Sequence, residues 1–322
     1  MTRAPLRPGV VTVTLNAAID QTLDCPGFTP GAVNRVLSET RTAGGKGVNV
    51  AALLASAGDG PITATGFLGH ENDAVFTGLF HERGIADRCI RLPGAVRTNV
   101  KLVDRTTGAV TDINLPGLTV PPDALSRLTA AVEELAAQAG CVVMAGSLPA
   151  GVPADVYGAL VPRVQAAGAF AAVDTSGPPL AHALAARPGM VKPNVHELSE
   201  HLGRPLPDTA AVVAAATDLH RTGITLVVVS LGAEGAVFVG AEGALKATPP
   251  AVEVASTVGA GDAMVAGVLS AWCRGAGLEE CARRGTAFAA GTLAVLGPSL
   301  PPPARLDELA RATAIHWLTA AG

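Results

Sequence analysis

The chain has 322 residues, a formal net charge of −4, 49% hydrophobic residues and 3% aromatic residues. A chain of this length can bury a large core. The negative balance and the scarcity of aromatic residues argue against a nucleic-acid surface or a polybasic membrane patch. We therefore expect neither nucleic acid nor a membrane among its partners.

The cysteines and one long uncharged segment exclude further classes of protein. The five cysteines are scattered and include no C-x-x-C pair, which favours reduced thiols over disulfides or a zinc site. The uncharged segment 285–304 is interrupted by glycine and proline, so it does not predict a membrane-spanning helix. We expect a cytoplasmic protein.

Residues 9–15 (GVVTVTL) predict the first β-strand rather than part of a leader peptide, because apolar residues alternate with threonine and no convincing cleavage site follows. Asn16 and Asp20 come next, and we place both at the end of this strand. There the carboxylate of Asp20 could accept hydrogen bonds from two sugar hydroxyls, or it could simply form a turn.

Two segments, residues 21–42 and 97–117, break the regular pattern of the chain. Both read as short strands joined by turns, and the sequence DRTTGAV in the second is typical of a hairpin. We expect them to pair as a small β-sheet that lies over the ends of the main strands as a lid. Arg97, Asn99 and Lys101 alternate along one strand and so share a face, which could grip a substrate phosphate or be a solvated edge.

The segment TAGGKGVNVAALL, residues 42–54, places Gly44, Gly45 and Gly47 around Lys46 at the start of a predicted helix. Its spacing is not that of a Walker A loop. The backbone amides of a glycine turn at a helix start can hold hydroxyls or a phosphate, and Lys46 would add positive charge. The alternative is a helix start with an exposed lysine.

Strand-like and helix-like segments alternate along most of the chain. The predicted strands are 61–67, 141–146, 169–174 and 225–232, and the predicted helices are 47–58, 71–84, 122–140, 153–168 and 208–223. This alternation is typical of an α/β fold with a mostly parallel sheet covered on both faces, in which ligands bind beyond the carboxyl ends of the strands. Near the end, LPPPARLDE predicts a stiff connector into a last helix.

Polar segments follow several of these strands, which points to one shared site. They are GSLP, DTSG, KPNVHE and SLGAEG, at residues 146–149, 174–177, 192–197 and 230–235. Asn194 can cap a helix whose third residue is Glu197; this capping-box variant is a structural alternative to orienting waters around a magnesium–phosphate group. Ser230, Gly232 and Gly235 predict a tight turn between strands, which could equally be a plain hairpin.

The segment STVGAGDAMVAG, residues 256–267, has a glycine turn followed by a carboxylate and a helical apolar pattern. Gly259 and Gly261 can reach positive φ, and Asp262 would open the helix among unpaired N–H groups at the positive end of the helix dipole. That field should keep the carboxylate ionised. A capped helix and a catalytic base beside an anion site both fit. A dinucleotide fingerprint fits poorly, because Met264 stands where its third glycine should be.

Together these motifs resemble the ribokinase-like PfkB carbohydrate kinase family over essentially the whole chain. The two family signatures match AGGKGVNVA and STVGAGDAMVAG in the expected order. TVTLNAAID, RTNVKL, GSLPAGVP and VKPNVHEL resemble the members that phosphorylate fructose 1-phosphate. The resemblance implies one kinase domain over residues 1–322, a ribokinase-like central α/β sheet with a small β-sheet lid, and a homodimer formed through the lids.

The resemblance also implies transfer of the γ-phosphoryl group of ATP to the 6-hydroxyl of fructose 1-phosphate, giving fructose 1,6-bisphosphate and ADP. Mg²⁺ is the implied cofactor, and a monovalent cation is a further candidate. Kinases for tagatose 6-phosphate or fructose 6-phosphate use the same machinery and remain alternatives. A catalytically silent sugar-phosphate sensor is a more distant alternative, against which the intact Asp262 argues.

By the same resemblance, each motif residue receives a role. Asp262 would be the catalytic base, and the amides of Gly259, Ala260 and Gly261 would bind the charge that develops on the transferred group. The implied sugar contacts are Asp20, Gly44, Gly45, Asn49 and Ser147, with Lys46 and Arg97 on the sugar's phosphate. The implied ATP contacts are Lys192, Asn194, Ser230, Gly232, Gly235 and Gly261, with Glu197 acting on magnesium through water.

Overall fold

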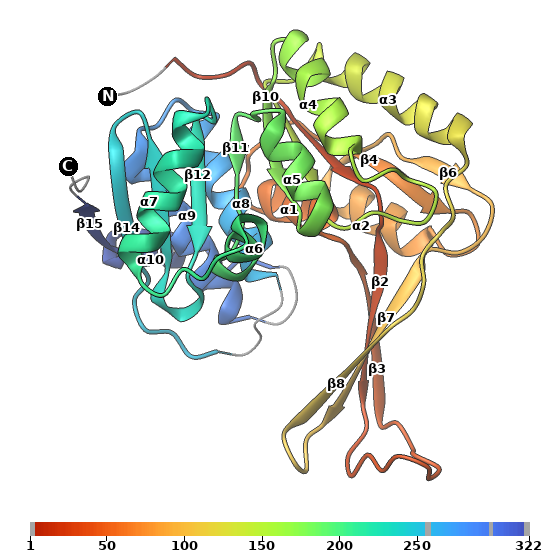
Figure 1. The fold of residues 1–322 in the computed structure, drawn as a ribbon. Coiled ribbons are helices and arrows are strands. Elements are labelled where there is room, and N and C mark those ends of the chain that lie inside the picture. The colour runs from red at the N-terminus through yellow and green to blue at the C-terminus, as the bar shows by residue number, and fades with distance from the viewer. Residues whose placement is uncertain (1–3, 255–258, 296–298, 319–322) are drawn as a thin grey trace.

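The structure, a computed structural model, describes residues 4–254, 259–295 and 299–318. Within these residues the main sheet has eleven strands, in the order β15-β14-β13-β12-β11-β10-β9-β1-β4-β5, with β6 beside β4 (Figure 1). Neighbours from β12 to β5 pair in parallel, whereas β13, β14 and β15 add antiparallel pairs at one edge. The predicted mostly parallel sheet is confirmed. The strands are β1 Val10–Thr14, β4 Ile62–Gly69, β5 Ala86–Asp87, β6 Ile90–Leu92, β9 Cys141–Ala145, β10 Phe170–Asp174, β11 Met190–Val191, β12 Leu226–Ser230, β13 Ala236–Gly240, β14 Gly243–Thr248 and β15 Ala314–Leu318.

Helices cover both faces of the main sheet. One layer holds α1 Lys46–Ser56, α2 Ala74–Arg83, α8 Ala260–Trp272, α9 Leu278–Leu293 and α10 Pro303–Ala312. The other layer holds α3 Pro122–Ala136, α4 Val156–Ala166, α5 Gly177–Ala185, α6 Val195–Leu202 and α7 Thr209–Arg221. Among the described residues, no helix combines the length and the apolar composition that crossing a membrane requires.

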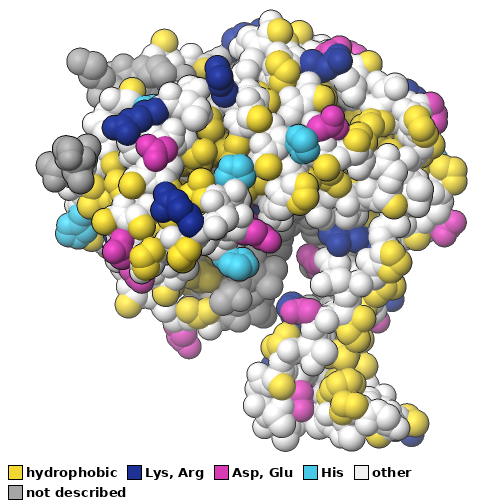
Figure 2. Space-filling view, in the orientation of Figure 1, with side chains coloured by type: hydrophobic (Ala, Val, Ile, Leu, Met, Phe, Trp, Pro, Cys, Tyr) yellow, Lys and Arg dark blue, Asp and Glu magenta, His cyan; other side chains and the backbone are white. Residues whose placement is uncertain are grey.

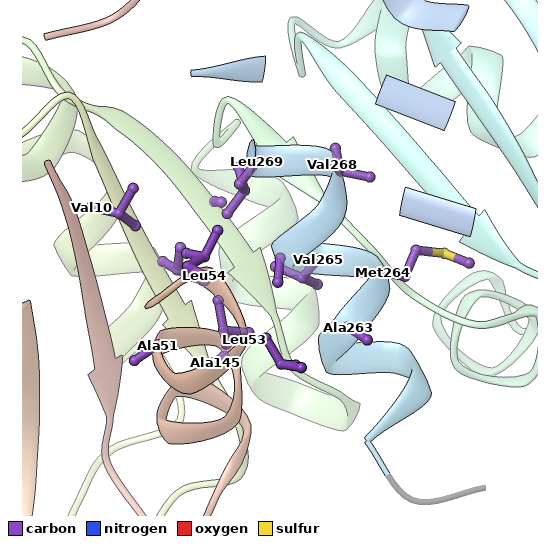
Figure 3. Close-up of a cluster of buried hydrophobic side chains, with 14 of the residues drawn as sticks. Val10, Ala51, Leu53, Leu54, Ala145, Ala263, Met264, Val265, Val268 and Leu269 are labelled. Atoms are coloured by element: carbon purple, nitrogen blue, oxygen red, sulfur yellow. The ribbon is translucent and has the colours of Figure 1, made fainter. Parts of the chain in front are cut away.

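The strands in the middle of the sheet are apolar throughout because each face meets a helix layer. Every residue of β9 is buried. Cys141 and Val143 belong to the core under α1 and α8, whereas Val142 and Met144 belong to the core under α3 and α4. Figure 3 shows side chains of α1 and α8 packed together in the first of these cores. Both cores fix the carboxyl ends of the strands, where the polar segments lie.

Four further strands form a separate small sheet, which we call the lid. It consists of β2 Ala18–Asp24, β3 Ser38–Gly44, β7 Arg97–Asp104 and β8 Ala109–Asn114, in the order β3-β2-β7-β8. The central pair β2 and β7 is parallel, and the outer pairs are antiparallel. Figure 1 shows the lid extending away from the helical layers as a twisted ribbon. The predicted hairpin at DRTTGAV is confirmed by the β7–β8 pairing, which brings Asp104 opposite Ala109.

The structure corrects the expected position of Asp20. We placed it at the end of the first strand, but β1 ends at Thr14, and Asp20 lies inside β2 of the lid. The chain changes sheets between Leu15 and Ala17, so what the sequence presents as one alternating run serves two different sheets. The sequence also gave no sign of β15, which follows the predicted last helix and pairs with β14.

Candidate active site

The glycine turn before Asp262 opens α8, as the sequence predicts. Gly259 has a φ of 83° and precedes the first helical residue, so Asp262 is the third residue of the helix. The first N–H groups of a helix have no partner within it. Residues 255–258, which precede this turn, lie outside the described residues. The helix start therefore places free N–H donors beside a carboxylate that is 7% exposed.

Asp262 is held by a residue from a distant part of the chain. The side-chain amide of Asn49, in the first turn of α1, donates to Oδ2 of Asp262 over 2.8 Å, and both side chains are buried. The pKa of Asp262 is raised from 3.8 to about 6: burial is the largest cause and the charge of Asp174 adds to it, whereas the hydrogen bond from Asn49 and the charges of Lys46 and Lys192 act in the opposite direction. The field of the helix alone would lower the pKa of Asp262, so the observed shift is in the opposite direction. With a pKa of about 6 the carboxylate is still mostly ionised at neutral pH.

A buried carboxylate, Asp174, lies between two lysines close to this base. Asp174 ends β10 and is 1% exposed. Its Oδ1 is 3.2 Å from Nζ of Lys46 and 3.5 Å from Nζ of Lys192. Burial alone would lower the pKa of Lys46, but the charges of Asp174, Asp262 and Glu197 outweigh it and raise that pKa. The two lysines and three carboxylates therefore form one electrostatic unit.

Lys192 also connects this unit to the start of α8. A Cβ built on Gly261 would lie 3.5 Å from Nζ of Lys192. The ammonium group and the first turn of the helix therefore face the same space. Both favour an anion, because one contributes positive charge and the other contributes N–H donors.

Asp20 lies where the lid joins the body of the protein. Its Oδ1 accepts a hydrogen bond of 3.0 Å from the side-chain amide of Asn99 on the neighbouring strand. A Cβ on Gly44 would lie 2.2 Å from Oδ2 of Asp20, so only glycine leaves room for this carboxylate. Gly45, with a φ of 114°, then turns the chain into α1, whose first residue is Lys46. Burial raises the pKa of Asp20.

Arg97 begins β7 and lies next to Ala18 in the parallel pair. Its Nη2 donates to the backbone oxygen of Asn16 over 3.3 Å. No carboxylate of the described residues forms an ion pair with this guanidinium, and burial lowers its pKa. Lys101, two positions beyond Asn99, is instead paired with Asp112 of β8. Of the two lid cations that the sequence places on one face, Arg97 is the one that forms no ion pair in the described chain, although the charge of nearby Asp20 acts on it.

Ser147 is exposed and lies beside Asn16, whose side-chain amide donates to the hydroxyl of Ser147 over 3.1 Å and to the backbone oxygen of Leu148 over 3.3 Å. Asn16 therefore links Ser147 to Arg97, one through its side chain and the other through its backbone.

The capping box at α6 is present in full. Oδ1 of Asn194 accepts from the backbone N–H of Glu197, and Oε2 of Glu197 accepts from the backbone N–H of Asn194, each over 2.8 Å. The structural interpretation of these two residues is therefore confirmed. A functional role for Glu197 is still compatible with this motif. Its second carboxylate oxygen takes no part in the capping box, and its charge acts on Lys46.

Ser230 ends β12 and a short 3₁₀ turn, η1 Gly232–Glu234, leads into the antiparallel β13. Ser230 pairs with Asn194 in an isolated parallel bridge. A cavity of about 320 Å³ opens beside them; its lining includes Asn194, Ser230 and Gly232 together with His196, Asp208 and Glu234. Gly235 does not line this cavity. A Cβ there would lie 1.9 Å from the backbone oxygen of Ala247, so the need for glycine comes from packing against β14.

Two residues of this site were missed when candidates were assigned from the sequence. Asp174 belongs to DTSG, a segment already noted as following a strand, and its place at a strand end was the available signal. Asn16 was placed at the same strand end as Asp20 but received no role. Within the described part of the chain, no cluster of three or more His, Cys, Asp or Glu side chains is arranged to hold a metal by itself.

Comparisons with known proteins agree with this arrangement. Residues 13–305 match the family described as pfkB family carbohydrate kinase. A protein from Rhodobacter capsulatus named 1-phosphofructokinase is 52% identical over 96% of this chain and 98% of its own. One from Xanthomonas campestris with the same name is 50% identical over 86% of this chain and 89% of its own.

Solved structures of phosphofructokinase-2 from Escherichia coli share the fold. The form in complex with substrates and products has a TM-score of 0.88 and 30% identity, covering 94% of this chain and 98% of that one. A potassium complex has a TM-score of 0.88 and 30% identity, covering 97% and 99%. A tetrameric inhibited form has a TM-score of 0.87 and 30% identity, covering 95% and 98%.

Proposed function

The chain belongs to the pfkB family of carbohydrate kinases, and we propose that its reaction is the transfer of the γ-phosphoryl group of ATP to the 6-hydroxyl of fructose 1-phosphate. It is a sugar-phosphate kinase, and so a phosphotransferase. The choice of acceptor is supported by two relatives at 50% identity or more, both named 1-phosphofructokinase. The observation that carries the chemistry is the buried pair of Asp262 and Asn49 at the open start of α8.

In this proposal Asp262 accepts the proton of the attacking hydroxyl. A pKa of about 6 suits a base at neutral pH, because the group is mostly ionised yet basic enough to take a proton. Asn49 donates to one carboxylate oxygen and so leaves the other to face the substrate. The N–H groups of Gly259, Ala260 and Gly261, with Lys192 opposite them, would stabilise the charge that develops on the transferred group.

The sugar phosphate would occupy the space between the lid and the first turn of α1. Arg97 is the natural phosphate ligand, since it is partly buried and has no carboxylate partner among the described residues. Lys46 would share the phosphate while keeping its ion pair with Asp174. The remaining proposed sugar contacts are Asp20, Gly44, Gly45, Asn49 and Ser147.

The nucleotide would lie along the ends of β11 and β12. Lys192 and Asn194 follow β11, Ser230 ends β12 and Gly232 comes shortly after it, so the four residues lie at the carboxyl ends of two neighbouring strands. Gly235 would contribute by shaping the turn rather than by direct contact, because it packs against β14.

Members of this family use ATP together with Mg²⁺. The site fits such an ion, because Oδ2 of Asp174 is buried and without a partner among the described residues, and Glu197 has one carboxylate oxygen outside its capping box. Mg²⁺ keeps several waters and one or two carboxylates besides phosphate, which is what these two residues could provide. When bound, the ion would supply positive charge to the phosphates of ATP.

The experiment that tests the function is a comparison of acceptors in an ADP-release assay. We expect kcat/KM for fructose 1-phosphate to exceed the values for fructose 6-phosphate and tagatose 6-phosphate by more than tenfold. A preference for either of the other two sugars would overturn the assigned acceptor while leaving the kinase intact. Repeating the assay in potassium chloride and in tetramethylammonium chloride tests whether the reaction depends on a monovalent cation. The potassium complex of a similar protein motivates this test.

We further propose that two copies of the chain associate through their lids, and that the enzyme acts in the cytoplasm, where ATP is available. Large apolar side chains are exposed mainly on the lid and the loop at its tip, and Figure 2 shows hydrophobic side chains gathered there. They are Val33, Val36, Leu37, Val110, Ile113 and Leu115, with exposed fractions of 86%, 44%, 72%, 52%, 48% and 43%. An apolar surface of this kind on a thin sheet is typical of an interface between subunits.

A further inference from the structure

The segment that leads into Arg97 runs directly against the chain that follows β4. The backbone N–H of His70 donates to Leu92 over 3.0 Å, and that of Glu71 donates to Gly94 over 3.1 Å. A Cβ on Gly69 would lie 2.4 Å from the backbone oxygen of Gly94. The two backbones are therefore in contact, and the pairing of β4 with β6 continues beyond the end of both strands.

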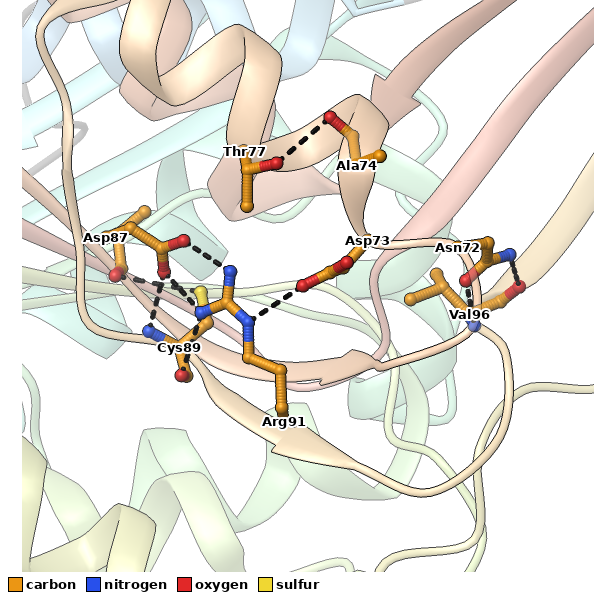
Figure 4. Close-up of polar contacts among 9 residues, drawn as sticks. Asn72, Asp73, Ala74, Thr77, Asp87, Cys89, Arg91 and Val96 are labelled. Carbon is orange, nitrogen blue, oxygen red and sulfur yellow. Dashed lines mark hydrogen bonds and ion pairs between the residues drawn. The ribbon is translucent and has the colours of Figure 1, made fainter.

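Asn72 extends this pairing with its side chain. Its Nδ2 donates to the backbone oxygen of Val96 over 2.9 Å, and its Oδ1 accepts from the backbone N–H of Val96 over 2.7 Å (Figure 4). The amide thus pairs with Val96 as a backbone peptide group would. Val96 is 3% exposed, so water cannot readily replace either bond. One side chain fixes both backbone groups of the residue immediately before Arg97.

Asn72 is itself part of a rigid block. The next residue, Asp73, accepts a hydrogen bond from Nε of Arg91 over 3.0 Å. Arg91 also donates to Oδ1 of Asp87 over 2.7 Å and to the backbone oxygen of Cys89 over 3.0 Å (Figure 4). These bonds join the start of α2 to β5 and β6. Val96 is therefore tied to the body of the protein at the point where β7 leaves it for the lid.

We propose that Asn72 is a positioning residue for substrate binding: by holding Val96 it sets the place and direction of the Arg97 guanidinium. This inference rests on the proposed role of Arg97 as a ligand of the sugar's phosphate. Asn72 does not touch the substrate in this account. It acts through the backbone, since within the described residues the guanidinium of Arg97 is held by a single hydrogen bond, the 3.3 Å bond to the backbone oxygen of Asn16.

The test is a comparison of Michaelis constants in Asn72→Ala. We expect KM for fructose 1-phosphate to rise about tenfold, which corresponds to ~1.4 kcal/mol, while KM for ATP and kcat stay within about twofold. Asn72→Gln, which carries the same amide on a longer side chain, should recover part of the loss and provides a folded variant if alanine destabilises the protein. Thr77→Val is the matched control, because the Thr77 hydroxyl donates to the backbone oxygen of Ala74 within its own helix.

A double-mutant cycle with Arg97→Ala separates failure of this inference from failure of the proposed function. Positioning predicts that Asn72→Ala adds little to the KM of Arg97→Ala, since the group it positions is gone. If Arg97→Ala leaves KM for the sugar phosphate unchanged, the proposed phosphate site is wrong. If Arg97→Ala raises that KM but Asn72→Ala does not, or if the two effects add in full, Asn72 does not act through Arg97. A parallel rise in KM for ATP would show a general structural role instead.

Discussion

The main sheet and the lid are built from the same kind of strand but are held in different ways. Every residue of β9 is buried, whereas every residue of β8 is exposed. The main sheet is fixed between two helix layers, so the side chains at its strand ends have little freedom. The lid is held mostly by cross-strand pairs, such as Lys101 with Asp112. A sheet held in this way can carry substrate contacts on one face and an interface on another.

The residues of the site divide between these two regions. Asp262, Asn49 and Asp174 belong to the body, where all three side chains are buried. Asp20 and Arg97 belong to the lid, where they meet the body at its edge. If the division is functional, changes in the body should lower kcat, and changes in the lid should raise KM for the sugar phosphate.

The largest effect is expected from the body, at the catalytic carboxylate. Asp262→Asn should lower kcat by about 10²–10⁴-fold, the usual contribution of a general base, with KM for ATP within about twofold. Asp155→Asn is the matched control, since Asp155 is exposed and its side chain makes no capping bond at α4. A near-normal kcat in Asp262→Asn would remove the base from the mechanism.

In the lid, Arg97→Ala should raise KM for fructose 1-phosphate by about 10–100-fold, because a hydrogen bond to a charged group contributes roughly 1.5–3 kcal/mol. KM for ATP should change less than about twofold. Arg41→Ala serves as the control, because Arg41 is an exposed lid residue whose ion pair is with Glu39. Steady-state kinetics with each substrate varied in turn measures both constants. Equal changes for the two substrates would contradict the division between body and lid.

The pH dependence of kcat/KM tests whether burial raises the pKa of the catalytic base. Because the pKa of Asp262 is raised from 3.8 to about 6, kcat/KM should fall about tenfold per pH unit below about 6, as the base becomes protonated. The same shift means that the folded protein binds a proton more readily than the unfolded chain, so ionisation of Asp262 costs stability as pH rises from about 4 to 6. Asp262→Asn should then be the more stable protein at pH 7.5, by on the order of 1–3 kcal/mol. A Tm below that of the wild type would indicate that burial does not dominate this pKa.

A smaller rise in KM is expected from the glycine that makes room for Asp20. Gly44→Ala would place a Cβ 2.2 Å from the Asp20 carboxylate and displace it. We expect KM for the sugar phosphate to rise about three- to tenfold, ~0.7–1.4 kcal/mol, with little change in KM for ATP. Gly78→Ala is the control: that helical position is open, so alanine should stabilise α2 by up to about 1 kcal/mol. Unchanged kinetics in Gly44→Ala would place Asp20 outside the sugar site.

The smallest effect on turnover is expected from the outer surface of the lid. Leu37→Asp should shift the protein from dimer to monomer in light scattering, because it places a charge in the proposed apolar interface. The kcat per subunit should stay within a few-fold of the wild type. Val254→Asp, at an exposed apolar residue that does not belong to the lid, should leave the mass unchanged. A monomeric wild-type protein, or a dimeric Leu37→Asp, would contradict association through the lids.

Much of this arrangement could be predicted because its signals are local. The glycine turn before Asp262 and the capping box of Asn194 and Glu197 depend on residues within a few positions of one another. The buried strands could be predicted from their continuous apolar segments. Asp20 was misplaced because a change of sheet between Leu15 and Ala17 leaves no mark in an alternating pattern.

What the sequence by itself determined is the alternation of the central strands with helices, together with the carboxylate at the start of α8. The tertiary structure alone decided which groups meet there. The partner of Asp262 is Asn49, 213 positions away in sequence, and the two lysines beside Asp174 come from different elements. The pKa of Asp262 also depends on these meetings, because desolvation and the charge of Asp174 are properties of packing that no local pattern contains.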